Sequence, residues 1–264
     1  MFLLVAACGV GDESSSSKTG SDTQLGPTDL VSGSKYTKIV IEVDSMTQRQ
    51  PSDAVVTQLL TDLNKLVDQG YLAKPGGVEV VHDDELPPSG DPDKVYTFGQ
   101  LDTLVNQVRS VTVPENVAVI HVLFVDGHYE DDEANSSVLG YAYGGDTIVM
   151  LKDNIQRTCT AGPVIQLLTP KLAEQVCALS EATVWLHEVG HLLGLVNNGL
   201  PMVEFHQDTA HGKHDQNPDC IMYWLNERSG VADVIAQKLQ AGNSDVSPFD
   251  AACLADLAAV SGKK

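Results

Sequence analysis

Residues 187–191 read His-Glu-Val-Gly-His, within an apolar stretch that predicts a buried α-helix ending at Gly194. On a helix, a spacing of four places His187 and His191 on one face, one turn apart. Burying two imidazoles and a carboxylate without partners is costly, so the pattern favours a metal site over chance surface histidines. We expect one Zn²⁺ held by both histidines, with Glu188 as the base that takes a proton from metal-bound water.

Two histidines leave the expected zinc site incomplete, because a catalytic zinc usually has three protein ligands and one open position. The chain continues HEVGHLLGLVNNG, and HExxHxxG resembles the metzincin clan of zinc peptidases, whose pattern runs on to a third histidine and a methionine turn. Asn197 stands at the position of that third histidine, and a neutral amide is a poor zinc ligand. Further along, residues 214–222 resemble the archaemetzincin ending, in which the third-ligand histidine starts an HCxxxxCxM run.

The resemblance covers roughly residues 181–224, with an insertion between Gly194 and His214. Asp215 replaces the first cysteine of the run, which argues against the cysteine-rich second zinc site of that family. His211 is the alternative third ligand, and His206 is a weaker one. The resemblance implies a full set of site residues: His187, His191 and His214 as zinc ligands, Glu188 as general base, and Met222 as the methionine-turn residue beneath the metal.

A thermolysin-like arrangement would instead take its third ligand, a glutamate, from a second helix downstream. The candidates are Glu204, in a loop flanked by Pro and Gly, and Glu227, beside Arg-Ser-Gly. Neither lies on a predicted long helix. That arrangement would also leave His211, His214 and the Cys-Ile-Met-Tyr run without a role, so the metzincin-like arrangement is favoured.

Composition limits the size and the partners of the protein. The 264 residues allow one catalytic domain or two small ones, and the 42% hydrophobic content is that of a globular protein. No stretch is long enough for a permanent transmembrane helix. The net charge of −20 argues against nucleic acid or an anionic membrane surface as partner. We expect a monomer that acts on a peptide or protein substrate.

The N-terminus predicts export. Residues 1–7 are short and apolar, and Val-Ala-Ala-Cys ending at Cys8 resembles a bacterial lipobox, although no basic segment precedes it. A Ser-rich polar stretch follows and predicts a disordered tether. An acylated Cys8 would anchor the protein to a bacterial membrane, in an extracytoplasmic location, without spanning it. The alternative is a stray cysteine. The expected organisation is signal and lipobox in 1–8, tether in 9–34, an N-terminal lobe with the active-site helix in 35–194, and a C-terminal lobe in 195–264.

The other four cysteines are an even number, as expected of a secreted chain with disulfides. Three pairings are possible. Pairing neighbours in the sequence gives Cys159–Cys177 and Cys220–Cys253, one on each side of the expected active site. A nucleophilic cysteine is not expected, since none has a histidine partner by motif.

Hydrophobic periodicity predicts an α/β fold with a twisted mixed sheet, a catalytic helix and a smaller C-terminal lobe. His121, within a buried central strand, is expected to be a core residue. In metzincin-like peptidases an edge strand pairs with the bound peptide, so the resemblance implies substrate binding by Leu139, Gly140, Tyr141 and Ala142. The expected strands are 36–43, 78–81, 117–125, 138–143 and 146–151, and the expected helices are 52–68, 98–111, the catalytic helix and about 249–260.

Two classes of function fit these features. The leading one is a lipid-anchored zinc endopeptidase. The second is a non-catalytic zinc-binding or adhesive surface lipoprotein on the same fold. The presence of Glu188 favours the enzyme, because zinc binding alone does not require a base at that position.

Overall fold

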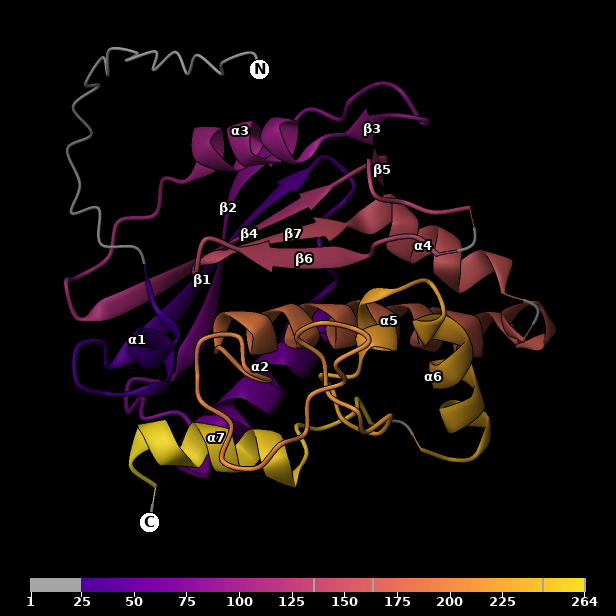
Figure 1. Cartoon of the computed structure of the whole chain (residues 1–264). Coiled ribbons are helices and arrows are strands. Elements are labelled where there is room, and N and C mark those ends of the chain that lie inside the picture. Colours follow the sequence, from indigo (N-terminus) through magenta and orange to yellow (C-terminus); the bar gives the residue numbers. More distant parts are fainter. Residues whose placement is uncertain (1–24, 135, 163, 244, 264) are drawn as a thin grey trace, which may run out of the picture.

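The computed structural model describes residues 25–134, 136–162, 164–243 and 245–263. Over these residues the protein has an α/β fold with a mixed sheet, as the sequence predicts. The sheet has five strands, and these residues form seven α-helices, more than the four predicted. Helix α3 covers one face of the sheet, and α2 and α5 lie against the other (Figure 1). Cys8 and residues 9–24 of the expected tether lie outside the described residues.

The main sheet has the strand order β2-β1-β4-β7-β6. Its first four strands are parallel, and β6 runs antiparallel to β7 and forms an edge. A separate two-stranded sheet joins β3 and β5. The strand bounds are β1 (Lys38–Met46), β2 (Val78–Leu86), β3 (Val95–Tyr96), β4 (Val117–Val125), β5 (His128–Tyr129), β6 (Gly140–Tyr143) and β7 (Thr147–Leu151).

Four of the seven described α-helices begin after a residue whose side chain caps free N–H groups. The Ser52 hydroxyl accepts from the third residue of α2, and Thr97 does the same for α3 within a capping box. The bounds are α1 (Pro27–Val31), α2 (Asp53–Asp68), α3 (Phe98–Val108), α4 (Lys152–Ala161), α5 (Pro170–Leu192), α6 (Val231–Gln240) and α7 (Ala251–Ser261), with short 3₁₀ helices η1 (Ile165–Leu167) and η2 (Trp224–Glu227).

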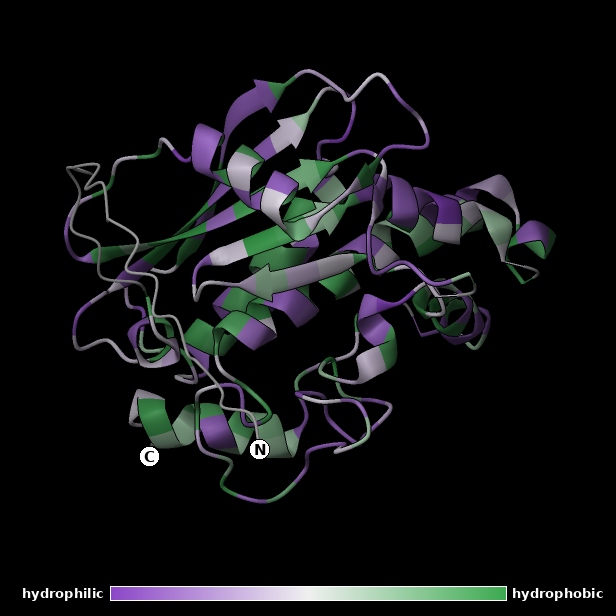
Figure 2. Cartoon of the chain, turned by 45° about the horizontal axis from the view of Figure 1, so that its top comes forward, coloured by the Kyte–Doolittle hydropathy of each residue, from purple (hydrophilic) through white to green (hydrophobic). Residues whose placement is uncertain are grey.

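The sheet is buried on both faces, which explains why its central strands are nearly continuous apolar runs. Along β7, Ile148 and Met150 pack into the core on the α5 side, whereas Val149 and Leu151 pack into the core on the α3 side. In Figure 2 the central strands are largely hydrophobic, and the polar residues lie mainly on outer helices and loops. Among the described residues no helix is both long enough and apolar enough to cross a membrane.

Helix α4, between β7 and α5, was not expected from the sequence. Its buried face includes Lys152 and Asn154, so the helical periodicity does not appear as an apolar stripe. Both polar side chains have partners there: the Lys152 ammonium is 2.5 Å from a Glu181 carboxylate oxygen, and the Asn154 amide donates to the Val138 carbonyl. Helix α6 is likewise absent from the predicted set of helices.

The tether predicted for residues 9–34 ends earlier than expected, because residues 27–31 form α1. Leu30 and Val31 of this helix are fully buried in the main core. The buried Lys74 side chain fastens the segment: its ammonium donates to the carbonyls of Asp29 and Tyr36, both at 2.7 Å, and to that of Ser32. A single buried cation thus joins three main-chain carbonyls of residues 29–36 to the segment that follows α2.

Replacing Lys74 by Met should destabilise the protein by about 1–3 kcal/mol, because three main-chain carbonyls lose their common donor while the apolar stem keeps its volume. Urea unfolding measures this difference. Lys65→Met, at an exposed position on α2, is the matched control and should change little. Equal stability of the two variants would contradict the role given to Lys74.

Candidate metal centre

Helix α5 carries the His-Glu-Val-Gly-His run through the interior. It starts with Thr169 as N-cap and Pro170 in the first turn. It ends in a Schellman motif, in which the amides of Gly194 and Leu195 donate to the carbonyls of His191 and Gly190. Gly194 has a φ of +80°, and a Cβ there would come within 2.5 Å of a carbon atom of α1. The predicted helix stop is therefore confirmed, and it also allows close contact with α1.

Three histidine side chains meet at the C-terminal part of α5. The Nε2 atoms of His187 and His191 are 3.1 Å apart. The ring of His214 lies 5.2 Å from that of His187 and 5.0 Å from that of His191, centroid to centroid. The structure thus brings together the three histidines for which the sequence predicted a common role. Donor atoms of these residues and of Glu227 all lie within 4.8 Å of one another, a grouping that could hold a metal ion.

Main-chain carbonyls orient two of the three imidazoles. The Nδ1 of His187 is 2.7 Å from the Ile221 carbonyl oxygen, and the Nδ1 of His214 is 2.5 Å from the His211 carbonyl oxygen. Since a carbonyl only accepts, each Nδ1 carries a proton, and in the neutral form of each imidazole Nε2 then has the free lone pair. This is the usual outer contact of a metal-binding histidine. His214 Nε2 is buried, has no hydrogen bond of ordinary geometry among the described residues and lies near the Glu227 carboxylate, which suits a donor atom of a metal site.

Met222 lies directly beside the helix, as the methionine-turn resemblance implies. It is fully buried, and a Cβ at Gly190 would lie 2.2 Å from its sulfur. The glycine inside the His-Glu-Val-Gly-His run is therefore needed for close packing of the methionine against α5. Asn226 closes the same turn by donating to the carbonyls of Cys220 and Ile221.

Glu227 is the site residue that the sequence analysis set aside. Its Oε2 is 3.4 Å from Nε2 of His214 and 3.7 Å from Nε2 of His187. Burial acts to raise the pKa of Glu227, but the two imidazoles outweigh it and hold the pKa well below its ordinary value. The only signal in the sequence is its place five residues after Met222, in the segment already expected beneath the metal.

The charges of these groups depend on one another. Burial, with His187 and His214 adding to it, lowers the pKa of His191 well below its ordinary value. Burial also acts to lower the pKa of His214, but the Glu227 carboxylate offsets this and leaves it above its ordinary value. A neutral His191 with a free lone pair is the form that can bind a metal.

Glu188 is completely buried, and neither carboxylate oxygen has a hydrogen-bond partner of ordinary geometry among the described residues. Burial raises its pKa well above the ordinary value, and the Glu227 carboxylate adds to this, while the Ala142 amide and Arg228 act in the opposite direction. A buried, unpaired carboxyl group is costly. Glu188 follows His187 on α5 and is influenced by the charge of Glu227, a position that suits a group that binds or relays a proton rather than one that stabilises the fold.

The alternative ligands named from the sequence lie elsewhere. His211 is exposed, stacks on Trp224 with ring centroids 4.4 Å apart, and pairs with Asp208. Asn197 is exposed at the surface and donates to Gln207.

His206 is held away from the centre by two carboxylates. Its Nδ1 is 2.5 Å from Asp215 and its Nε2 is 3.0 Å from Asp256. Burial acts to lower the pKa of His206, but the two carboxylates raise it above the ordinary value. His206 therefore fastens its loop to α7.

Edge strand β6 includes three of the four residues predicted to bind substrate. The bond from Leu151 N to Leu139 O fixes the hydrogen-bonded pairs of the β6–β7 ladder, so the main-chain groups of Gly140 and Ala142 face the free edge. Leu139 itself is different, because its amide donates to Glu227 O and its side chain is fully buried. The prediction that Leu139 pairs with substrate is therefore wrong.

The cysteines predicted to pair lie close together as free thiols. The sulfurs of Cys220 and Cys253 are 3.7 Å apart beneath the methionine turn. Cys159 and Cys177 lie on the adjacent helices α4 and α5 and interact with each other. The two disulfides themselves stay a prediction.

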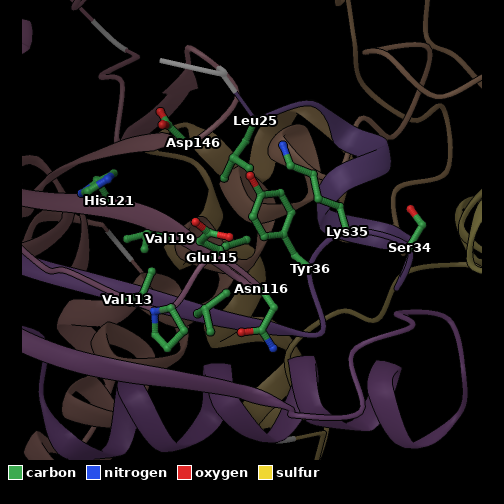
Figure 3. Close-up of a pocket in the computed structure, with 13 residues that line it drawn as sticks. Leu25, Ser34, Lys35, Tyr36, Val113, Glu115, Asn116, Val119, His121 and Asp146 are labelled. Atoms are coloured by element: carbon green, nitrogen blue, oxygen red, sulfur yellow. The ribbon is translucent and has the colours of Figure 1, made fainter. Parts of the chain in front are cut away.

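A cavity of about 830 Å³ lies away from the histidines, where β1 and β4 begin (Figure 3). Tyr36 and Asn116 contribute to its wall, with His121 at one side. The Nδ1 of His121 is 2.6 Å from the buried Glu42 carboxylate, and its side chain is 14% exposed. His121 is thus a paired residue of the sheet, in agreement with the role expected from the sequence.

Comparisons with known proteins do not assign the chain to a family. No protein-family model matches it, and no curated protein matches it. What the centre can do is therefore judged from its own residues: three convergent imidazoles, the buried Glu188, the half-buried Glu227 and a nearby edge strand.

Gly190→Ala should destabilise the protein. The added methyl group would meet the Met222 sulfur at 2.2 Å and Phe249 at 3.0 Å. Overpacking of this kind costs about 1–3 kcal/mol, which exceeds the roughly 1 kcal/mol that alanine gains over glycine in a helix. Gly99→Ala, on α3 with nothing within 4 Å, is the control and should be neutral or slightly stabilising.

The Gly190→Ala/Met222→Ala double variant tests the contact itself. Since the second change removes the sulfur that the new methyl group would meet, the pair should cost less than the sum of the two single changes. Urea unfolding of the four proteins gives this coupling. Strict additivity would show that Met222 does not pack on Gly190.

Proposed function

We propose that the protein is a zinc-dependent endopeptidase of the metzincin-like type. One observation carries the proposal: the donor atoms of three histidines converge, and the buried carboxyl group that follows His187 on α5, Glu188, has no hydrogen-bond partner of ordinary geometry among the described residues. A purely structural metal site would need the imidazoles but not Glu188. Three imidazole donors suit Zn²⁺, and the unpartnered Nε2 of His214 fits such an ion.

The proposed chemistry divides between metal and protein. A zinc ion held by His187, His191 and His214 would lower the pKa of a bound water and polarise the substrate carbonyl. Glu188 accepts the proton of the attacking water and then delivers it to the leaving amine. The raised pKa of Glu188 suits both steps, because the group must hold the proton between them.

The substrate is proposed to bind as an added strand along β6. Gly140 and Ala142 offer main-chain groups at the free edge, and a Cβ at Gly140 would lie 3.3 Å from Cγ of Glu188. A peptide paired there would run beside the proposed base. On the opposite face of β6, Tyr141 and Tyr143 form an aromatic group with Tyr129 and Phe98. Alternate side chains of the peptide would reach this group.

The location remains a proposal that depends on the N-terminal sequence. The Val-Ala-Ala-Cys run ending at Cys8 supports lipid anchoring outside the cytoplasm of a bacterium. An even number of remaining cysteines, brought together as two pairs, supports an oxidising compartment. A monomer that meets protein substrates at a cell envelope fits these features.

Glu188→Gln should keep the zinc and lose nearly all peptide hydrolysis, because an amide cannot accept the proton. We expect a decrease in kcat/KM of at least about 10²-fold, the lower range for general-base catalysis. Zinc content by mass spectrometry and cleavage of a peptide library measure the two effects separately. Glu204→Gln, at an exposed position, is the matched control and should change neither. Unchanged cleavage by Glu188→Gln would end the proposed mechanism.

A further inference from the structure

Glu227 and the three histidines form a group of four residues whose donor atoms all lie within 4.8 Å of one another. Ligands 2.0–2.1 Å from a tetrahedral metal are separated from one another by roughly 3.3 Å. The observed separations are 3.1 Å between His187 and His191, 3.4 Å between His214 and Glu227, and 3.7 Å between His187 and Glu227. We infer that Glu227 is a fourth protein ligand of the metal.

The main chain holds Glu227 in this position from both sides. Its carbonyl accepts the amide of Leu139, and the next residue, Arg228, bridges to Val138. On the other side, Asn226 is fixed by its bonds to the methionine-turn carbonyls. The Glu227 carboxylate is therefore positioned by the last two residues of a short 3₁₀ helix, both of which are held by hydrogen bonds, and its side chain is only 16% exposed.

Charge favours the same assignment. A dication surrounded by three neutral imidazoles carries an excess of two positive charges, and a buried excess is costly. Glu227 brings one compensating charge within direct reach. The other buried carboxyl group, Glu188, is not among the residues whose donor atoms converge, so Glu227 is the carboxylate placed to supply this charge.

Coordination by Glu227 has a consequence for the proposed peptidase, on which this inference rests. Three histidines leave an open position for water, whereas four protein ligands form a closed site of the structural kind. The resting enzyme would then be latent, and water or substrate would have to displace Glu227 or add a fifth ligand. The Glu227 carbonyl accepts the amide of Leu139, the residue directly before β6. A peptide that pairs with β6 would therefore bind next to the segment that positions Glu227.

The test uses the full-length protein loaded with cobalt(II) in place of zinc, since its visible spectrum reports the ligands. A bound water in a three-histidine site ionises near pH 7, so the spectrum of such a site changes with pH. The wild type should show a four-coordinate spectrum that is constant from about pH 6 to 9 because no water is bound. Glu227→Ala should gain a spectral transition near pH 7.

Competition with a chelator gives an independent measure. Glu227→Ala and Glu227→Gln should bind zinc roughly 10- to 100-fold more weakly than wild type. A loss of this size is usual when a residue that hydrogen-bonds to a metal ligand is removed, and removal of a ligand itself should cost at least as much. Glu204→Gln should bind like wild type. A wild-type spectrum that already titrates near pH 7, with unchanged zinc affinity in the Glu227 variants, would overturn the inference and leave Glu227 as an ion-pair partner only.

These readouts separate this inference from the proposed function. A wild type with a closed, pH-independent cobalt site that cleaves no peptide would refute the peptidase and support the fourth ligand. A wild type that cleaves peptides and whose cobalt spectrum changes with pH near 7 would support the peptidase and refute the fourth ligand. Failure of the wild type to take up any metal would overturn both.

Discussion

The hydrogen bond between His187 and the Ile221 carbonyl joins the two parts from which the centre is built. His187 belongs to the buried helix α5, and Ile221 belongs to the turn that contains Met222. The bond fixes the tautomer of His187 and the position of the turn relative to α5. Asn226 donates to the same carbonyl. The position of the turn therefore also determines where η2 lies and where it places the carboxylate of Glu227.

Close packing at two glycines allows this junction to form. Because Gly190 has no side chain, the Met222 sulfur can lie against α5. Gly194, with a φ of +80°, lets the chain turn after α5 in close contact with α1. After the reversal, His206 is bound to Asp256 of α7 and to Asp215, the residue that follows His214. This anchoring explains how a third histidine can return to the centre from beyond an insertion. Burial and pairing of His206 also remove it from the candidate ligands.

The sequence predicted the elements whose signal is local. The apolar run of 117–125 is β4 to the residue, and the spacing of His187 and His191 gives their shared face. Helix α4 could not be found in this way, because part of its buried face is polar and satisfied only by distant partners. Glu227 was set aside as a metal ligand because it does not lie on a predicted long helix. It reaches the centre from a 3₁₀ helix of four residues, whose place depends on contacts with β6 and the methionine turn.

The central claim is that His187, His191 and His214 hold one zinc ion. Zinc bound per protein, measured after purification of wild type, His214→Ala and His211→Ala, tests it most directly. The structure predicts one equivalent in wild type and in His211→Ala, whose imidazole stacks on Trp224 at the surface, and a loss of zinc in His214→Ala. Retention of zinc by His214→Ala together with its loss from His211→Ala would contradict the account.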